Sequence, residues 1–337
     1  MTTVVAVVLM TGIVLYGVFG GADFGTGLWD LTAGGAARGA RPRALIDHAI
    51  GPVWEANHTW LIFCLVILWT GFPDAFSAIM TTLYIPLGIA AFGIVLRGSG
   101  FAFRKVSMRT AEQRLNGIAF ATSSVLTPFC FGAVAGGVAS GRVPSGGHGD
   151  PVTSWLNPTS VLGGVLAVVT CGYLAAVFLT AEAHRSGQPD LEQWSRRRAV
   201  GAAVAAGVAA AVGLFVLHHD ARRLFDHLLR DGWPLIALSA LAGAAALLST
   251  ALRIRPVLVR PLGVLAVGAV LAGWGVAQYP YLLGTHLTIH AGAAPPATMD
   301  ALGIVTVLAV VLVAPSLAWL FLLTHRGALS EESTGHA

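Results

Sequence analysis

The chain has 337 residues, of which 55% are hydrophobic and only 11% are charged. An ordinary soluble protein carries about 25% charged residues. This composition therefore excludes an ordinary soluble protein and predicts a single domain embedded in a lipid bilayer. The net charge of +4 comes without a basic patch interleaved with aromatic residues, and we therefore expect no nucleic-acid partner. No basic segment precedes the first apolar run, which argues against a cleaved signal peptide.

Nine apolar runs follow one another along the chain, and most have the roughly 20 residues that a membrane-crossing helix needs. We therefore predict an all-α integral membrane protein with nine transmembrane helices. Four plus four plus one helices allow a first four-helix bundle over 4–138, a second over 158–278 and a peripheral helix, all within one transmembrane domain of residues 1–337. The predicted helices are 4–30, 50–71, 76–97, 116–138, 158–182, 199–217, 233–252, 258–278 and 301–324. Pro86 and Pro128 lie inside the third and fourth helices and should kink them.

The basic residues predict the orientation of these helices. We expect all twenty to lie outside the long apolar runs, with sixteen in the odd-numbered connections and the C-terminal tail. Basic residues near helix ends stay on the cytoplasmic side, so the N-terminus is predicted to be periplasmic and the C-terminus cytoplasmic. The sixteen are Arg38, Arg41, Arg43, Arg97, Arg104, Lys105, Arg109, Arg114, Arg185, Arg196, Arg197, Arg198, Arg253, Arg255, Arg260 and Arg326, against Arg142, Arg222, Arg223 and Arg230 on the other side.

The first helix combines a glycine stripe with an acidic residue. Gly17, Gly21 and Gly25 recur at four-residue spacing, which lets a neighbouring helix approach closely. Asp23 falls roughly on the opposite face. An acid inside a membrane crossing is costly unless it is paired, protonated or hydrated, so its default interpretation is functional.

The second helix contains the densest polar cluster of the chain, Trp54-Glu55-Ala56-Asn57-His58-Thr59-Trp60. Glu55 and His58 share one face and could exchange a proton, whereas we assign Trp54, Asn57 and Trp60 to helix packing together with the glycine stripe. At 1.5 Å per residue, Asp23 lies about 10 Å and Glu55 about 6 Å from the inner membrane surface. Acids at this depth suit a proton entrance from the cytoplasm. A structural pair that orients helices one and two remains the alternative.

Other potential ligand sites have weaker support. Glu55 and His58 form one Glu-x-x-His pair, but a di-iron carboxylate site needs a second one, which does not occur. His286 and His290 lack a third metal ligand. The connection 218–232 carries balanced charges, which favours a solvated amphipathic segment over a ligand site. The histidines within helices are too few for two haems with two histidine ligands each, so we predict neither a metal nor a cofactor held by this chain.

The motif of the first helix, Gly20-Gly21-Ala22-Asp23-Phe24-Gly25, and that of the second, Gly51-Pro52-Val53-Trp54-Glu55-Ala56-Asn57-His58-Thr59-Trp60-Leu61, resemble subunit II of the cytochrome bd-type quinol oxidases. The resemblance extends over nearly the whole chain. Its further matches are Phe72-Pro73-Asp74-Ala75-Phe76, Arg97-Gly98-Ser99-Gly100-Phe101-Ala102-Phe103-Arg104, Asn157-Pro158, Tyr279-Pro280, Leu287-Thr288-Ile289 and Ala294-Pro295-Pro296.

This resemblance implies a heterodimer in the bacterial cytoplasmic membrane. Subunit I would hold haems b and d and the quinol site, so subunit II would have no catalytic residue and would stabilise its partner. The complex would oxidise quinol and reduce dioxygen to water. In some members of the family the acid at the position of Glu55 helps to deliver protons from the cytoplasm; Asp23 matches the acidic position of the first motif, and members carry His or Gln where His58 stands. A small single-helix accessory subunit and a bound structural quinone or lipid are left open.

A proton-coupled secondary transporter is the alternative. The buried acids Asp23 and Glu55 and the helices that contain proline would also suit such a protein. Transporters of this kind usually have an internal repeat with matching broken helices, and the sequence contains no clear repeat.

Overall fold

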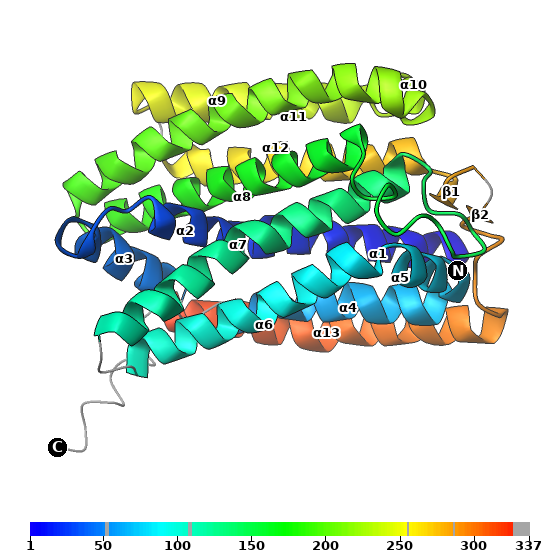
Figure 1. Cartoon of the computed structure of the whole chain (residues 1–337), viewed down its shortest axis with the longest axis horizontal. Coiled ribbons are helices and arrows are strands. Elements are labelled where there is room, and N and C mark those ends of the chain that lie inside the picture. Colours follow the sequence, from blue (N-terminus) through cyan, green and yellow to red (C-terminus); the bar gives the residue numbers. More distant parts are fainter. Residues whose placement is uncertain (51–53, 107–109, 255, 286, 326–337) are drawn as a thin grey trace.

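The computed structural model of the chain describes residues 1–50, 54–106, 110–254, 256–285 and 287–325, and these are almost entirely α-helical. Long helices run roughly parallel to one another along the molecule (Figure 1). One end, called here the N-terminal end, holds residue 1, the short helices α5 and α10 and a β-hairpin, whereas the opposite end, called the α3 end, holds the short helix α3 (Figure 1). The prediction of an all-α membrane protein is confirmed.

The first crossing is a continuous helix of 30 residues from Thr2 to Leu31. It consists of α1 (Thr2–Leu15), a π-helical turn η1 (Tyr16–Gly20) and α2 (Gly21–Leu31). The predicted bounds of 4–30 agree with it. In the half of the molecule nearer the α3 end, α2 packs against α7 and α8 (Figure 1).

The region of the second and third predicted helices differs from expectation. An additional helix α3 (Ala36–Ile50) precedes α4 (Trp54–Gly71), and the third predicted crossing is present but its predicted bounds of 76–97 are wrong. Its first residues belong to a short helix α5 (Pro73–Thr82), while the long helix is α6 (Tyr84–Val106). The chain bends by 116° between α4 and α5. The physical cause is Pro73, which has no backbone N–H to continue α4 and therefore starts a new helix.

Pro86 accordingly lies in the first turn of α6, where a missing N–H breaks no hydrogen bond, so the kink predicted there has no physical basis. Pro128 does lie inside its helix, α7 (Thr110–Ala139).

The second half of the chain follows the predicted order more closely. Asn157 begins α8 as a side-chain cap, because its Oδ1 accepts a hydrogen bond from Ser160 N at 2.9 Å and Pro158 occupies the first helical position. The remaining elements are α8 (Pro158–Arg185), α9 (Pro189–Asp220), α10 (Arg222–Arg230), α11 (Trp233–Leu252), α12 (Pro256–Gln278), the antiparallel strands β1 (Tyr281–Leu283) and β2 (Leu287–Thr288), and α13 (Pro296–His325).

Among the described residues, seven helices are long and apolar enough to cross a membrane, or eight if the bent pair of α4 and α5 counts as one crossing. The helix α13 adds a shorter apolar stretch, Pro296–Leu312, and packs against α1 and α4. The helices α9 and α11 lie along one side of the molecule, and α4, α6 and α13 lie along the other (Figure 1). The count of nine crossings remains a prediction.

Candidate functional site

A buried ion pair joins three helices in the interior. Asp23 lies in the first turn of α2 and Arg97 lies in α6, and their side chains are only 2% and 4% exposed. Arg97 Nη2 donates to Asp23 Oδ1 at 2.6 Å and to the Asp23 carbonyl oxygen at 3.0 Å. Arg97 Nη1 donates to Ser124 Oγ of α7 at 3.2 Å. Each charge therefore has a counter-charge, without which burial at this depth would be very costly.

Two phenylalanine rings flank the guanidinium group. The Arg97 Cζ atom lies 5.1 Å from the ring centroid of Phe24 and 4.7 Å from that of Phe120. Their faces attract the cation and cover it with apolar surface. Because water is kept away, the attraction between Arg97 and Asp23 is stronger than it would be at a membrane surface.

The expectation that every basic residue lies outside the apolar runs is wrong for Arg97. The predicted helix bounds placed Arg97 in a cytoplasmic connection, but α6 continues to Val106 and Arg97 is 3% exposed within it. One signal could have identified it: Asp23 needed a counter-charge, and Arg97 stands where an apolar run continues through the small residues of Gly98-Ser99-Gly100.

Glycines bring the helices of this site together. A Cβ atom at Gly27 of α2 would collide with the Ser124 side chain of α7, and one at Gly93 of α6 would collide with Thr127 Oγ1. On the other side of α2, a Cβ atom at Gly25 would overlap the carbonyl oxygen of Cys171 in α8. The short distances between Asp23, Arg97 and Ser124 depend on these close approaches.

The predicted glycine stripe contacts two different helices. Gly21 and Gly25 face α8, whereas a Cβ atom at Gly17 would meet the Leu271 side chain of α12. The helix contact with α8 is extended by a hydrogen bond from Trp29 Nε1 to the carbonyl oxygen of Gly172 at 2.8 Å.

The second oxygen of Asp23 faces a different environment from the first. Asp23 Oδ2 is buried and has no hydrogen-bond partner among the described residues. His58 of α4 lies close enough to Asp23 to interact electrostatically with it, and its ring centroid is 5.9 Å from that of Phe24. The structure therefore brings Asp23 and His58 into one region.

The other predicted residues of α4 divide into two groups. Asn57 is buried, at 7% exposure, and Trp60 is half-buried with its ring centroid 6.3 Å from that of Phe63. The side chains of Trp54 and Glu55 lie outside the described residues, as do Arg104, Lys105, Arg255, His286 and Arg326.

A second acid of the first helix is paired at the α3 end. Asp30 is 4% exposed, and its Oδ1 accepts a hydrogen bond from Arg43 Nε at 2.7 Å. Arg43 Nη2 also donates to the carbonyl oxygen of Gly34 at 2.6 Å. This arginine, which sequence analysis used only as a marker of orientation, thus holds α3 against the end of α2.

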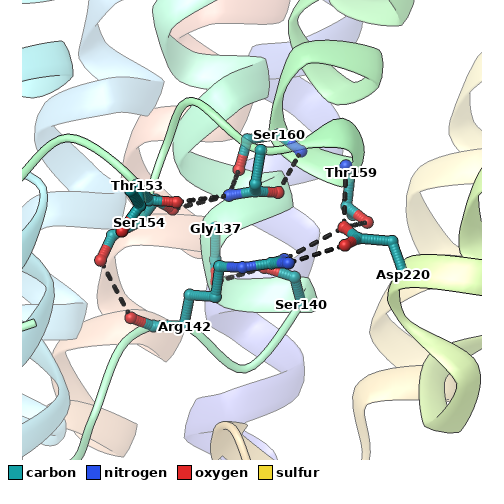
Figure 2. A network of polar contacts seen from close by, with 9 residues as sticks. Gly137, Ser140, Arg142, Thr153, Ser154, Thr159, Ser160 and Asp220 are labelled. Carbon is teal, nitrogen blue, oxygen red and sulfur yellow. Dashed lines mark hydrogen bonds and ion pairs between the residues drawn. The ribbon is translucent and has the colours of Figure 1, made fainter. Parts of the chain in front are cut away.

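A third pair of arginine and aspartate lies at the N-terminal end and is called here the Arg142 clamp (Figure 2). Arg142 binds Asp220 with two parallel hydrogen bonds of 3.0 and 2.6 Å. Thr159 donates to Asp220 Oδ2 from its side chain at 2.6 Å and from its backbone at 3.1 Å. The clamp joins the loop after α7, the start of α8 and the end of α9.

The balanced charges of 218–232 predicted a solvated segment around Asp220, whereas its side chain is only 16% exposed. The neighbouring helix α10 is also anchored, because Leu224 is buried and Arg223 donates to the carbonyl oxygen of Gly284 in the β-hairpin. The Arg223 Cζ atom lies 4.0 Å from the ring centroid of Tyr281.

Long apolar helices that pack around a buried ion pair define a multi-pass, helical membrane protein. A family model described as "Cytochrome bd terminal oxidase subunit II" matches residues 1–324. The chain therefore belongs to the subunit II family of the cytochrome bd terminal oxidases. The resemblance that the motifs of the first two helices predicted is confirmed.

Individual relatives agree with this assignment. The chain is 27% identical over 164 residues to "Cytochrome bd ubiquinol oxidase subunit 2" of Bacillus subtilis (strain 168), a match that covers 48% of this chain and 47% of that protein. It is 25% identical over 171 residues to "Cytochrome bd-I ubiquinol oxidase subunit 2" of Escherichia coli (strain K12), covering 48% and 44%. The chain thus spans about half the length of the curated relatives it matches.

A solved structure shows the same fold over a longer stretch. A chain of the bd oxidase from Geobacillus thermodenitrificans superposes with a TM-score of 0.81, although the two sequences are only 23% identical. The superposition covers 96% of this chain and 98% of the other.

Proposed function

We propose that this chain is the haem-free subunit II of a bacterial cytochrome bd-type quinol oxidase. It stabilises a haem-bearing subunit I and provides part of the route by which cytoplasmic protons reach the site of dioxygen reduction. The complex is an oxidoreductase that transfers electrons from quinol to dioxygen, and the chemistry takes place in the partner subunit. The observation that carries this proposal is the family match over residues 1–324.

In the proposed membrane arrangement, the N-terminus is periplasmic and nine helices cross the cytoplasmic membrane as two four-helix bundles with α13 at the periphery. Basic residues support this orientation. The α3 end holds Arg38, Arg41 and Arg43 of α3 together with Arg185 and the arginines at 196–198. Of the basic residues that the structure describes, only Arg142, Arg222, Arg223 and Arg230 lie near the other end, so the proposed arrangement has the α3 end at the cytoplasm.

The proposed absence of haem from this chain is consistent with its histidines. Among the described residues, His58 is the only histidine in the interior of a long apolar helix, away from the helix ends. The rings of Tyr16 and Phe24 lie against it, with centroids 6.4 and 5.9 Å away. A single interior histidine surrounded by aromatic rings does not fit a haem with two histidine ligands. The haems b and d belong to the proposed partner.

The proposed proton path uses Glu55, His58 and Asp23. Arg97, which also donates to Ser124, fixes Asp23 Oδ1, and Asp23 Oδ2 has no hydrogen-bond partner among the described residues. A carboxylate held in this way can accept a proton at Oδ2 without losing its bond to Arg97 through Oδ1. Glu55 stands one turn of α4 before His58, nearer to the α3 end.

Purification of the tagged chain from its natural membrane tests the assignment. A haem-bearing partner with a chlorin absorption band should be recovered with it, and the chain expressed alone should be colourless. Haem retained by the chain alone, or purification without any pigmented partner, would contradict the proposal. A small accessory subunit, or a structural quinone or lipid, would be detected by mass spectrometry of the same preparation.

A further inference from the structure

Tyr16 is a half-buried residue with a buried hydroxyl group, and it has no role in the proton path proposed above. It begins the π-helical turn η1, and its hydroxyl oxygen is buried without a hydrogen-bond partner among the described residues. The same is true of Asp23 Oδ2, two turns further along the same helix. A hydroxyl group can donate one hydrogen bond, and a carboxylate oxygen can only accept, so the two orphaned atoms are chemically complementary.

The Tyr16 ring lies over Gly20, on the side of the helix that leads towards Asp23. A Cβ atom at Gly20 would be 2.8 Å from Tyr16 Cε2 and 3.4 Å from Cζ, so only glycine lets the ring occupy this place. Phe24, the residue that follows Asp23, has its ring edge-on to the Tyr16 ring. The orphaned donor and the orphaned acceptor therefore belong to one cluster.

The π-helical turn contributes to this arrangement. Within it the N–H of Gly21 donates to the carbonyl oxygen of Tyr16, a bond that spans five residues where an α-helix spans four. The wider turn changes the angle between Tyr16 and the residues of α2. Single π-helical turns inside α-helices are frequent at functional sites.

Side chains from two other helices enclose the Tyr16 ring. His58 of α4 and Phe131 of α7 have ring centroids 6.4 and 6.0 Å from it, and Phe24 lies edge-on at 6.4 Å. Tyr16 thus lies where the first helix meets α4, with its ring beside that of His58.

We propose that Tyr16 is a positioning residue for Asp23 in the proton path, with its hydroxyl donating a hydrogen bond to Asp23 Oδ2 directly or through one water molecule. This inference rests on the proposed function. When a proton arrives at Asp23 Oδ2, the neutral carboxyl group becomes the donor and the Tyr16 oxygen accepts. Only O–H bonds form and break in this exchange, and Tyr16 returns to its starting state once the proton moves on.

The test uses the purified, haem-loaded complex and two variants, Tyr16→Phe and Tyr173→Phe. Tyr173 of α8 is the matched control, because its hydroxyl is also buried without a partner among the described residues but lies against Gly263 of α12. The first measurement is oxygen consumption per haem, and the second is the infrared band of the Asp23 carboxylate, identified as the band that Asp23→Asn removes. Expressing turnover per haem separates the effect from any loss of assembly.

Tyr16→Phe should lower turnover about fivefold, as expected for the loss of one hydrogen bond, without changing the KM for quinol. It should also shift the Asp23 band, whereas Tyr173→Phe should change neither measurement. If Tyr16→Phe has normal turnover and an unshifted Asp23 band while Asp23→Asn has lowered turnover, the role of Tyr16 is refuted but the proton path through Asp23 is not. Full turnover in Asp23→Asn would overturn the proton path through Asp23 and the role of Tyr16 with it.

Discussion

The central ion pair and the Arg142 clamp use the same two residue types in opposite ways. In the clamp, Arg142 and Thr159 satisfy both oxygens of Asp220, and the arginine is 34% exposed. In the centre, Arg97 occupies only one oxygen of Asp23, although both side chains are almost completely buried. A saturated pair has no site left for a proton and is structural. An unsaturated pair in a more apolar place keeps an acceptor that stability alone does not require.

The largest effect is expected from Arg97→Leu, which leaves the Asp23 carboxylate buried without its counter-charge. Removing one partner of a buried pair costs about 3–5 kcal/mol, so little haem-loaded complex should be recovered from membranes. The double variant Asp23→Leu with Arg97→Leu should recover assembly but not oxygen consumption. Equal yields of the single and double variants would show that the two charges are not coupled.

Replacement of the proposed proton carriers should affect turnover rather than assembly. Glu55→Gln is expected to lower oxygen consumption by about tenfold or more, because a general acid–base group of this kind contributes at least that much, while haem content stays normal. Asp23→Asn should behave similarly if both acids serve one route. Normal turnover in Glu55→Gln would refute its role, and lost assembly in Asp23→Asn would favour the structural interpretation of the central pair.

A smaller effect is expected where α2 meets α8. Gly25→Ala places a methyl group against the Cys171 carbonyl oxygen, and the overpacking should cost about 1–3 kcal/mol, measured as a lower melting temperature of the complex. Gly207→Ala in α9 is the matched control, because nothing lies within 4 Å of its added Cβ atom. Equal melting temperatures for the two variants would contradict the close contact.

The smallest effect should come from the clamp. Asp220→Asn keeps the shape of the side chain but removes its charge, so the complex should lose about 1–2 kcal/mol of stability while oxygen consumption per haem stays unchanged. Asp226→Asn, whose side chain is 56% exposed, should have no measurable effect. A large loss of turnover in Asp220→Asn would erase the functional difference between the two pairs.

Local patterns predicted what depends on neighbouring residues. The apolar runs indicated the long helices, and the four-residue spacing indicated a glycine stripe in the first of them. Hydropathy could not show that Pro73 starts a separate helix, because the apolar run continues through the bend. Hydropathy also did not indicate α3, because its sequence is too polar to resemble a membrane crossing.

The ion-pair partners of the charged residues could not be predicted from the sequence for another reason. Arg97 and Asp23 are 74 residues apart, and Arg142 and Asp220 are 78 residues apart, so no local periodicity connects either pair. A rule that counts arginines as surface markers necessarily treats Arg97 and Arg43 alike. Only the folded packing shows that one of them lies in the interior and the other at a helix end.

The bend between α4 and α5 has a consequence for electrical insulation. It brings Phe72 and Leu83, both 0% exposed, into one apolar cluster with Val5, Val143, Leu283 and Met299 at the N-terminal end. In the proposed orientation this apolar cluster separates the Asp23 region from the periplasm. Ions that enter from the cytoplasm would meet no hydrated pathway to the periplasm, so they would not leak through this subunit and lower the membrane potential.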